Sequence, residues 1–225
     1  MRDDALQNAR RRAVLRQLAS AGAVGAASMA SMVSAALAAD PKNGIRYLKG
    51  GVTVDGKPAM AGQAIHPGQT VATEEDGEVV FVMGEDAFLQ RGNTRFAIED
   101  NAGVMVLRYL SGKVLSVFGK GRKTLVTPTA SIGIRGTACY IEAEPARTYF
   151  CLCYGSAEIT PIIDGNKRRV IRTSHHEYPL YIGARRGPLL VSPSTAVNHD
   201  DAELIMLEAL VGRLPPFHGK TYPDK

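Results

Sequence analysis

The chain has 225 residues, 27 of them lysine or arginine and 22 aspartate or glutamate, which gives a formal net charge of +5. Five of the basic residues and two of the acidic ones lie in the first 38 positions, so the remaining 187 residues carry a net charge of only +2. This balance, together with the lack of a stripe of interleaved basic and aromatic residues, argues against nucleic acid as a partner. The length suits a single domain with its own hydrophobic core.

The N-terminal segment has the layout of an export signal. A basic cluster that contains Arg11 and Arg12 precedes a run of small and apolar residues, and residues 36–38 form a small-x-small cleavage site. The stretch "RRAVLRQL" resembles a twin-arginine signal, and the low hydrophobicity of the run suits such a signal better than a stable membrane span. We therefore expect residues 1–38 to be removed and the mature protein to be periplasmic. Retention of the segment as an anchor is the alternative.

From Gly50 onward, short runs of β-branched and aromatic residues alternate with turn signals. Val52 and Val54 lead into Asp55-Gly56, which is a strong signal for a hairpin turn. Further turn signals follow at intervals of about ten residues, a spacing typical of all-β domains. The pattern predicts an all-β domain over residues 39–196.

One helix is predicted in the C-terminal part, residues 197–225. Asn198 or Asp200 can cap its start, and Gly212 with the two prolines that follow can end it. Its predicted apolar face consists of Ala202, Ile205, Met206, Ala209 and Leu210. We expect the helix to pack on an open end of the β-domain and to cover edge strands, with a Pro-rich tail behind it. A docking element for a partner is the alternative.

Two stretches resemble the FecR-like periplasmic domain. The first is "GGVTVDGKPAMAGQAIHPGQTVAT", with its Gly-x-Val-x-Val opening, spaced glycines and closing Val-x-Thr. The second is "TPTASIGIRGTACYIE", in which a Thr-Pro-x-Ala run leads into Ile-Arg-Gly-Thr. The resemblance covers roughly residues 45–172 and implies a compact twisted stack of short strands, similar to a solenoid or sandwich.

The best-known proteins of that family relay a signal from outer-membrane receptors to a cytoplasmic sigma factor. They carry a cytoplasmic tail and a membrane helix before the domain, whereas this chain shows only the predicted export signal, so the relay function is not carried over. Motifs of serine hydrolases, zinc proteases, Rossmann enzymes and Ser-x-x-Lys enzymes are missing from the sequence. We therefore expect a non-enzymatic binding, scaffold or signalling-associated module with a protein partner in the cell envelope.

The Arg-Gly-Thr segment of the second stretch comprises Arg135, Gly136 and Thr137. Gly136 is expected at a position with positive φ or close backbone approach. For Arg135 we expect a structural role, in which its guanidinium donates hydrogen bonds to the carbonyls of adjacent turns. Binding of an anionic ligand by Arg135 is the alternative.

All three cysteines lie within fifteen positions, at Cys139, Cys151 and Cys153. The last two are separated by one residue in a predicted strand, so their side chains point to one face. A three-residue loop in the predicted hairpin would place Cys139 opposite Cys153, which allows a disulfide, natural in an oxidising periplasm. A four-residue loop would send the sulfurs to opposite faces. The sequence leaves this register open.

Three of the five histidines follow the cysteine strand, at His175, His176 and His199. Thiolates and imidazoles together are ligands for zinc, copper or an iron centre. Because His175 and His176 are adjacent, only one of them is expected to ligate with the cysteines. Three interpretations of the cysteines stay open: buried apolar side chains, a disulfide, or a metal or redox site that uses Cys151, Cys153 and these histidines.

Overall fold

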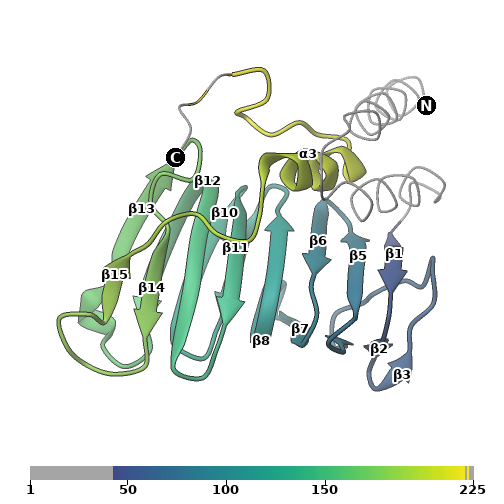
Figure 1. Cartoon of the computed structure of the whole chain (residues 1–225), viewed down its shortest axis with the longest axis horizontal. Coiled ribbons are helices and arrows are strands. Elements are labelled where there is room, and N and C mark those ends of the chain that lie inside the picture. The colour runs from purple at the N-terminus through teal and green to yellow at the C-terminus, as the bar shows by residue number, and fades with distance from the viewer. Residues whose placement is uncertain (1–42, 221, 223–225) are drawn as a thin grey trace.

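The structure is a computed structural model that describes residues 43–220 and 222. Within this part of the chain, short β-strands are followed by a single α-helix near the C-terminus, which confirms the predicted all-β fold with one C-terminal helix (Figure 1). The predicted export signal, residues 1–38, lies outside the described residues. No helix in the described part is long and apolar enough to cross a membrane.

The elements in chain order are β1 (Gly44–Lys49), β2 (Val52–Val54), β3 (Lys57–Pro58), β4 (Thr70–Thr73), β5 (Glu78–Met83), β6 (Asp86–Gln90), β7 (Thr94–Asn101), β8 (Val104–Val117), β9 (Arg122–Val126), β10 (Ala130–Arg135), β11 (Ala138–Ala143), β12 (Arg147–Pro161), the 3-10 turn η1 (Gly165–Lys167), β13 (Arg169–Thr173), β14 (Leu180–Gly183), β15 (Val191–Pro193) and α3 (Asp201–Leu210).

The strands form two layers, which we call sheet A and sheet B. Sheet A has the order β1-β5-β6-β8-β11-β12-β14-β15. Sheet B has the order β3-β2-β4-β7-β8-β9-β10-β12-β13. All neighbours are antiparallel except β8 and β9. The long strands β8 and β12 therefore belong to both layers and join them.

Each shared strand passes from one sheet to the other at a glycine. Gly112 in β8 has φ +83° and is the first residue of that strand to pair in sheet A, after Ser111 in sheet B. Gly155 in β12 has φ +99° and is the first residue of that strand to pair with β13 in sheet B, after Tyr154 in sheet A. A side chain at Gly112 would come within 2.2 Å of Thr94, and one at Gly155 within 2.6 Å of Thr137. Glycine is therefore required where the chain changes layers.

Two hydrophobic cores follow from the alternation of side chains along sheet A. Its inner face packs against sheet B, while its outer face packs against α3 and the chain around it. In β12, Phe150 and Leu152 point into the inter-sheet core, and Cys151 and Cys153 point into the outer core. The outer core is the place where the C-terminal part of the chain meets the cysteine strand.

The helix begins at the predicted cap. The Asp200 side chain accepts from the amide of Glu203, and the Glu203 side chain accepts in return from the amide of Asp200, which forms a capping box. Gly212, with φ +75°, follows the end of the helix. The helix packs on β6 and β8 in the middle of sheet A, so the expectation that it covers edge strands was wrong.

The buried face of the helix also differs from the predicted one. Ala202 and Ile205 are only half-buried, whereas Leu204 and Leu207 are fully buried. Two carboxylates share this face, Glu203 and Glu208. A sequence pattern does not assign charged residues to a buried face. Here each carboxylate forms an ion pair with an arginine, Glu203 with Arg91 and Glu208 with Arg213.

Candidate metal centre

Four predicted ligands meet at one point of the outer core. The ligand atoms of Cys151, Cys153, His176 and His199 all lie within 4.8 Å of one another. The two cysteines are fully buried, His176 is 6% exposed, and His199 is half-buried. The structure thus brings together residues from three separate segments into a compact set of two sulfurs and two imidazoles.

The hairpin register decides where the sulfurs go. Ala143 pairs with Thr148 and Cys139 with Leu152, which is the register expected of the four-residue loop and not of the three-residue one. Cys139 therefore lies in the inter-sheet core, while Cys151 and Cys153 lie on the outer face. All three cysteines are free thiols. The disulfide considered between Cys139 and Cys153 is absent because the two side chains leave the sheet on opposite sides.

His176 is positioned by the loop that follows β13. The Glu177 carboxylate accepts hydrogen bonds from the amides of Ser174 (2.7 Å) and His175 (3.4 Å) and from the Thr173 hydroxyl. His176 itself has φ +52°, a left-handed conformation that is uncommon outside glycine. Its amide donates to the carbonyl of Cys153 at 3.0 Å. Both histidine rings contact Asp201, but only His176 also reaches Sγ of Cys151.

His199 is positioned by the segment between β15 and α3. The Tyr149 hydroxyl donates to the carbonyl of Thr195 at 3.0 Å and accepts from the amide of Val197 at 3.2 Å. The ring of His199 stacks on Tyr140, with ring centroids 4.6 Å apart. The connecting segment is thereby fixed to the outer face of sheet A immediately before the helix begins.

Hydrogen bonds around the cluster determine which ring nitrogens face inward. Nε2 of His176 lies 3.2 Å from Oδ1 of Asp201, and Nδ1 of His199 lies 2.7 Å from the carbonyl oxygen of Val197. Carboxylate and carbonyl oxygens can only accept, so these two nitrogens carry the protons. Nδ1 of His176 and Nε2 of His199 then hold lone pairs and face each other at 3.1 Å. Two lone pairs at this distance repel unless a proton or a cation lies between them.

The spacing of the inward-facing atoms agrees with tetrahedral zinc. With Zn–N bonds of about 2.0 Å and Zn–S bonds of about 2.3 Å, two nitrogens stand about 3.3 Å apart and a nitrogen and a sulfur about 3.6 Å apart. In the structure the two nitrogens are 3.1 Å apart, and Sγ of Cys151 is 3.5 Å from Nδ1 of His176. These two distances are close to those of a tetrahedral site, and the four ligand atoms as a set lie within 4.8 Å of one another, so the donor set suits a zinc ion.

The electrostatics of the cluster favour one thiolate. The hydrogen bond from Cys153, together with those from His176 and His199, outweighs the effect of burial and lowers the pKa of Cys151 to about 3. Burial raises the pKa of Cys153, as does its hydrogen bond with Cys151. Burial also acts to lower the pKa of His199, but the hydrogen bond and the charge of Cys151 outweigh it and the pKa is raised. Without a metal, the cluster is thus a thiolate beside a histidine that is readily protonated.

His175 lies outside this set of four. Its Nε2 is 2.8 Å from Oδ2 of Asp201, and its ring stacks on Tyr222 and packs edge-on against Phe217. With His176 and Asp201 it forms a second, half-exposed group of ligand atoms. Asp201 was not among the predicted site residues, although its place directly after His199 and Asp200, at a helix start, was a usable signal.

The Arg-Gly-Thr segment lies at the end of β10. Gly136 has φ +57°, so the predicted positive φ is present. Thr137 is fully buried, and its carbonyl accepts from the amide of Phe118 at 2.8 Å. Arg135 is exposed because it alternates with the buried Ile134 along β10. Within the described residues its guanidinium makes no hydrogen bond or ion pair, so the expected contacts with turn carbonyls are not formed.

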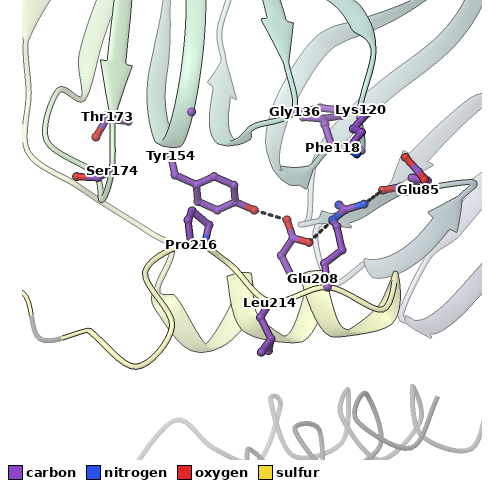
Figure 2. A pocket seen from close by; sticks show the side chains of 13 residues that line it. Glu85, Phe118, Lys120, Gly136, Tyr154, Thr173, Ser174, Glu208, Leu214 and Pro216 are labelled. Atoms are coloured by element: carbon purple, nitrogen blue, oxygen red, sulfur yellow. Dashed lines mark hydrogen bonds and ion pairs between the residues drawn. The ribbon is translucent and has the colours of Figure 1, made fainter. Parts of the chain in front are cut away.

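A cleft of about 580 Å³ lies beside the C-terminal end of α3 (Figure 2). At its centre the Tyr154 hydroxyl donates to the carboxylate of Glu208, which also accepts from Nε of Arg213 at 2.6 Å. Arg213 donates further to the carbonyl of Glu85 at 2.7 Å. These central polar groups are occupied with one another, and they attach the end of the helix to sheet A.

Neither protein-family models nor curated proteins give a match to this sequence. Among solved structures, two crystal structures of a "putative anti-sigma factor" from Parabacteroides distasonis are similar to this chain. Their TM-scores are 0.45 and 0.44, with 10% and 11% sequence identity, and each match covers 56% of this chain and 59% of the other. Similarity this low carries no argument about function.

Proposed function

We propose that this chain is an exported, non-enzymatic protein with a FecR-like domain that binds one zinc ion at Cys151, Cys153, His176 and His199. The observation that carries the proposal is the convergence of these four side chains, with all ligand atoms within 4.8 Å of one another. Two thiolate sulfurs and two imidazole nitrogens in a tetrahedral arrangement are a donor set typical of zinc.

The hydrogen bonds behind the ligands support the same conclusion. Histidines that bind metals usually donate their other ring N–H to a carboxylate or a backbone carbonyl, which fixes the ring and the tautomer. His176 does so with Asp201, and His199 does so with the carbonyl of Val197. The two inward-facing nitrogens, Nδ1 of His176 and Nε2 of His199, are then free to bind a metal ion.

The site has the features of a structural or regulatory centre rather than a catalytic one. Four protein ligands complete a tetrahedral zinc site and leave no position for water or substrate. Both sulfurs are fully buried. Copper(I) also accepts thiolate and imidazole ligands, so the identity of the metal is part of the test below.

The wider role that we propose is a binding or scaffold module of the cell envelope, associated with signalling and acting through a protein partner. The support for this role is the two FecR-like stretches and the export signal in the sequence. The zinc site adds a feature that the family resemblance did not imply.

The experiment is a metal measurement on the full chain, exported in a bacterial host and purified without chelators. We expect close to one zinc per chain by elemental analysis. Cys151→Ala, Cys153→Ala, His176→Ala and His199→Ala should each lower the zinc content. Matched controls are Cys139→Ala, which removes the buried thiol on the other face, and His218→Ala, which removes an exposed histidine. Wild-type protein without stoichiometric metal, or controls that lose as much metal as the ligand variants, would overturn the proposal.

A further inference from the structure

The four ligands come from two parts of the molecule. Cys151 and Cys153 belong to β12, and His176 is tied to that strand by the bond from its amide to the Cys153 carbonyl. His199 belongs to the chain that connects β15 to the end of α3, residues 194–210, which we call the C-terminal segment. An ion held by all four ligands therefore joins the C-terminal segment to sheet A.

The C-terminal segment contributes to the site a second time. Asp201, in the first turn of α3, accepts from Nε2 of His176 and so orients a ligand that belongs to the β-domain. Movement of the segment away from the sheet would remove one ligand, His199, and the acceptor that aligns another. Metal affinity is thereby coupled to the position of the helix.

The segment covers apolar surface that sheet A would otherwise expose. The side chains of the outer face that are buried beneath it or beside it are Val80, Val82, Leu89, Leu115 and Val117. Contiguous apolar surface of this kind is uncommon on a soluble protein unless it binds something. In the structure its occupant is the C-terminal segment itself.

Polar contacts along its length also hold the segment in place: the Tyr149 hydroxyl bonds Thr195 and Val197, and the Tyr154 hydroxyl bonds Glu208. Arg91 donates to both carboxylate oxygens of Glu203, at 2.7 and 2.9 Å. The side-chain amide of Asn198 donates to the carboxylate of Glu142 at 2.6 Å. A ten-residue helix is marginal on its own in water, so α3 depends on these contacts and on its apolar packing.

We infer that a bound metal ion latches the C-terminal segment onto sheet A, so that loss of the ion populates an open form with the outer face exposed; this inference rests on the proposed zinc site. The open form retains Cys151, Cys153 and His176 and therefore binds the ion more weakly than the closed form. The ratio of the two affinities sets how far the ion shifts the equilibrium. An ion at 100 times its dissociation constant suppresses opening by up to about 100-fold.

The test is amide hydrogen exchange by mass spectrometry on the full chain, with Zn²⁺ bound and after its removal by a chelator. We expect chelation to accelerate exchange of residues 195–210 at least tenfold and to leave β9 and β10, in sheet B, unchanged, because these strands do not touch the site. Zinc added back should restore protection. His199→Ala should give the fast exchange in both conditions, whereas His218→Ala should behave like wild type.

The outcomes separate this inference from the proposed function. If zinc binds stoichiometrically but exchange of the segment is the same with and without it, the latch is wrong and the zinc site stands. If chelation accelerates exchange equally in both sheets, the ion stabilises the whole fold and the latch is again wrong. A protein that takes up no zinc overturns both. Leu207→Ala is a positive control for the detection of opening. It removes a fully buried side chain of α3 and should accelerate exchange of the segment even with zinc bound.

Discussion

Oδ1 of Asp201 lies 3.2 Å from Nε2 of His176, so a residue at the start of α3 fixes the ring of a histidine 25 positions earlier in the chain. Because this contact occupies Nε2, the other ring nitrogen, Nδ1, faces Cys151 and lies 3.5 Å from its Sγ. A helix start and a loop after a strand thus cooperate in one site, although neither contains a complete motif.

Asp201→Asn should weaken metal binding without abolishing it. The amide can turn its oxygen toward His176 but lacks the charge that makes the imidazole a stronger ligand. Loss of such an outer contact typically costs 10–100-fold in metal affinity. Competition with a chromophoric chelator measures the change, while zinc content at saturation should stay near one per chain.

Asp200→Asn is the matched control. Asparagine is as good a helix cap as aspartate, and Asp200 does not contact the histidines. Equal affinities for the Asp201 and Asp200 variants would contradict the role given to Asp201.

Gly136→Val should destabilise the fold. Gly136 has φ +57°, a conformation that a β-branched residue adopts only under strain, although a side chain there would meet open space. The strain alone should cost about 1–3 kcal/mol in free energy of unfolding by denaturant titration. Gly133→Val, three residues earlier in β10, is the control, because its added Cβ would meet only Glu158 at 4.0 Å and its φ is ordinary. Equal stabilities for the two variants would show that backbone conformation is not the cause.

Asp86→Ala should be costly because Asp86 and Lys123 form a buried ion pair. Oδ1 of Asp86 is 3.2 Å from Nζ of Lys123, and the two side chains are 4% and 9% exposed. Removal of one partner leaves a buried charge, which costs about 3–5 kcal/mol. The exposed pair between Arg108 and Glu99 is the comparison, and Glu99→Ala there should cost less than about 1 kcal/mol. A reversed order of the two losses in thermal unfolding would contradict the assignment.

The carboxylate of Asp86 should also make the stability of the protein depend on pH. Burial raises the pKa of Asp86 above its ordinary value of 3.8, in spite of Lys123 and the Gly119 amide. The folded protein therefore holds this proton more tightly than the unfolded chain does. Its contribution to stability is complete below the unfolded pKa and is lost as the pH rises through the folded pKa. The stability difference between wild type and Asp86→Asn should fall over that range, and a flat difference would contradict the raised pKa.

Export can be tested apart from the fold. If residues 1–38 are a twin-arginine signal, Arg11→Lys combined with Arg12→Lys should leave unprocessed precursor in the cytoplasm, because the paired arginines are the recognised feature of such signals. Immunoblots of cell fractions measure this. Normal processing of the double variant would rule out that route but not a periplasmic location.

The sequence predicted the local features of the fold well. The predicted Asp55-Gly56 turn joins β2 to β3, with φ +52° at Asp55 and +76° at Gly56. Such a hairpin depends only on neighbouring residues, so it can be predicted from the local sequence. The sharing of β8 and β12 between two sheets was not predicted. A glycine such as Gly112 indicates a bend, but only long-range pairing shows that the strand continues through it into the other layer.

The candidate site was predictable by residue type but not by geometry. Cysteines and histidines gathered in one part of the chain suggest a metal, yet nothing in their spacing favours His176 over His175. That choice follows from the fold around His176, whose backbone is left-handed and whose Nδ1 lies 3.5 Å from Sγ of Cys151. Asp201 contacts both histidines, and it reaches them only because α3 packs on sheet A. The expectation for Arg135 was wrong for a simpler reason, since strand alternation places it in solvent.

The most direct test of the central claim is X-ray absorption at the zinc edge on the purified full chain. If Cys151, Cys153, His176 and His199 hold the ion, the fitted shell should contain two sulfurs at about 2.3 Å and two nitrogens at about 2.0 Å. Cys139→Ala should give the same spectrum, and Cys153→Ala should lose one sulfur. A shell of oxygen and nitrogen without sulfur, or zinc far below one per chain, would contradict the account.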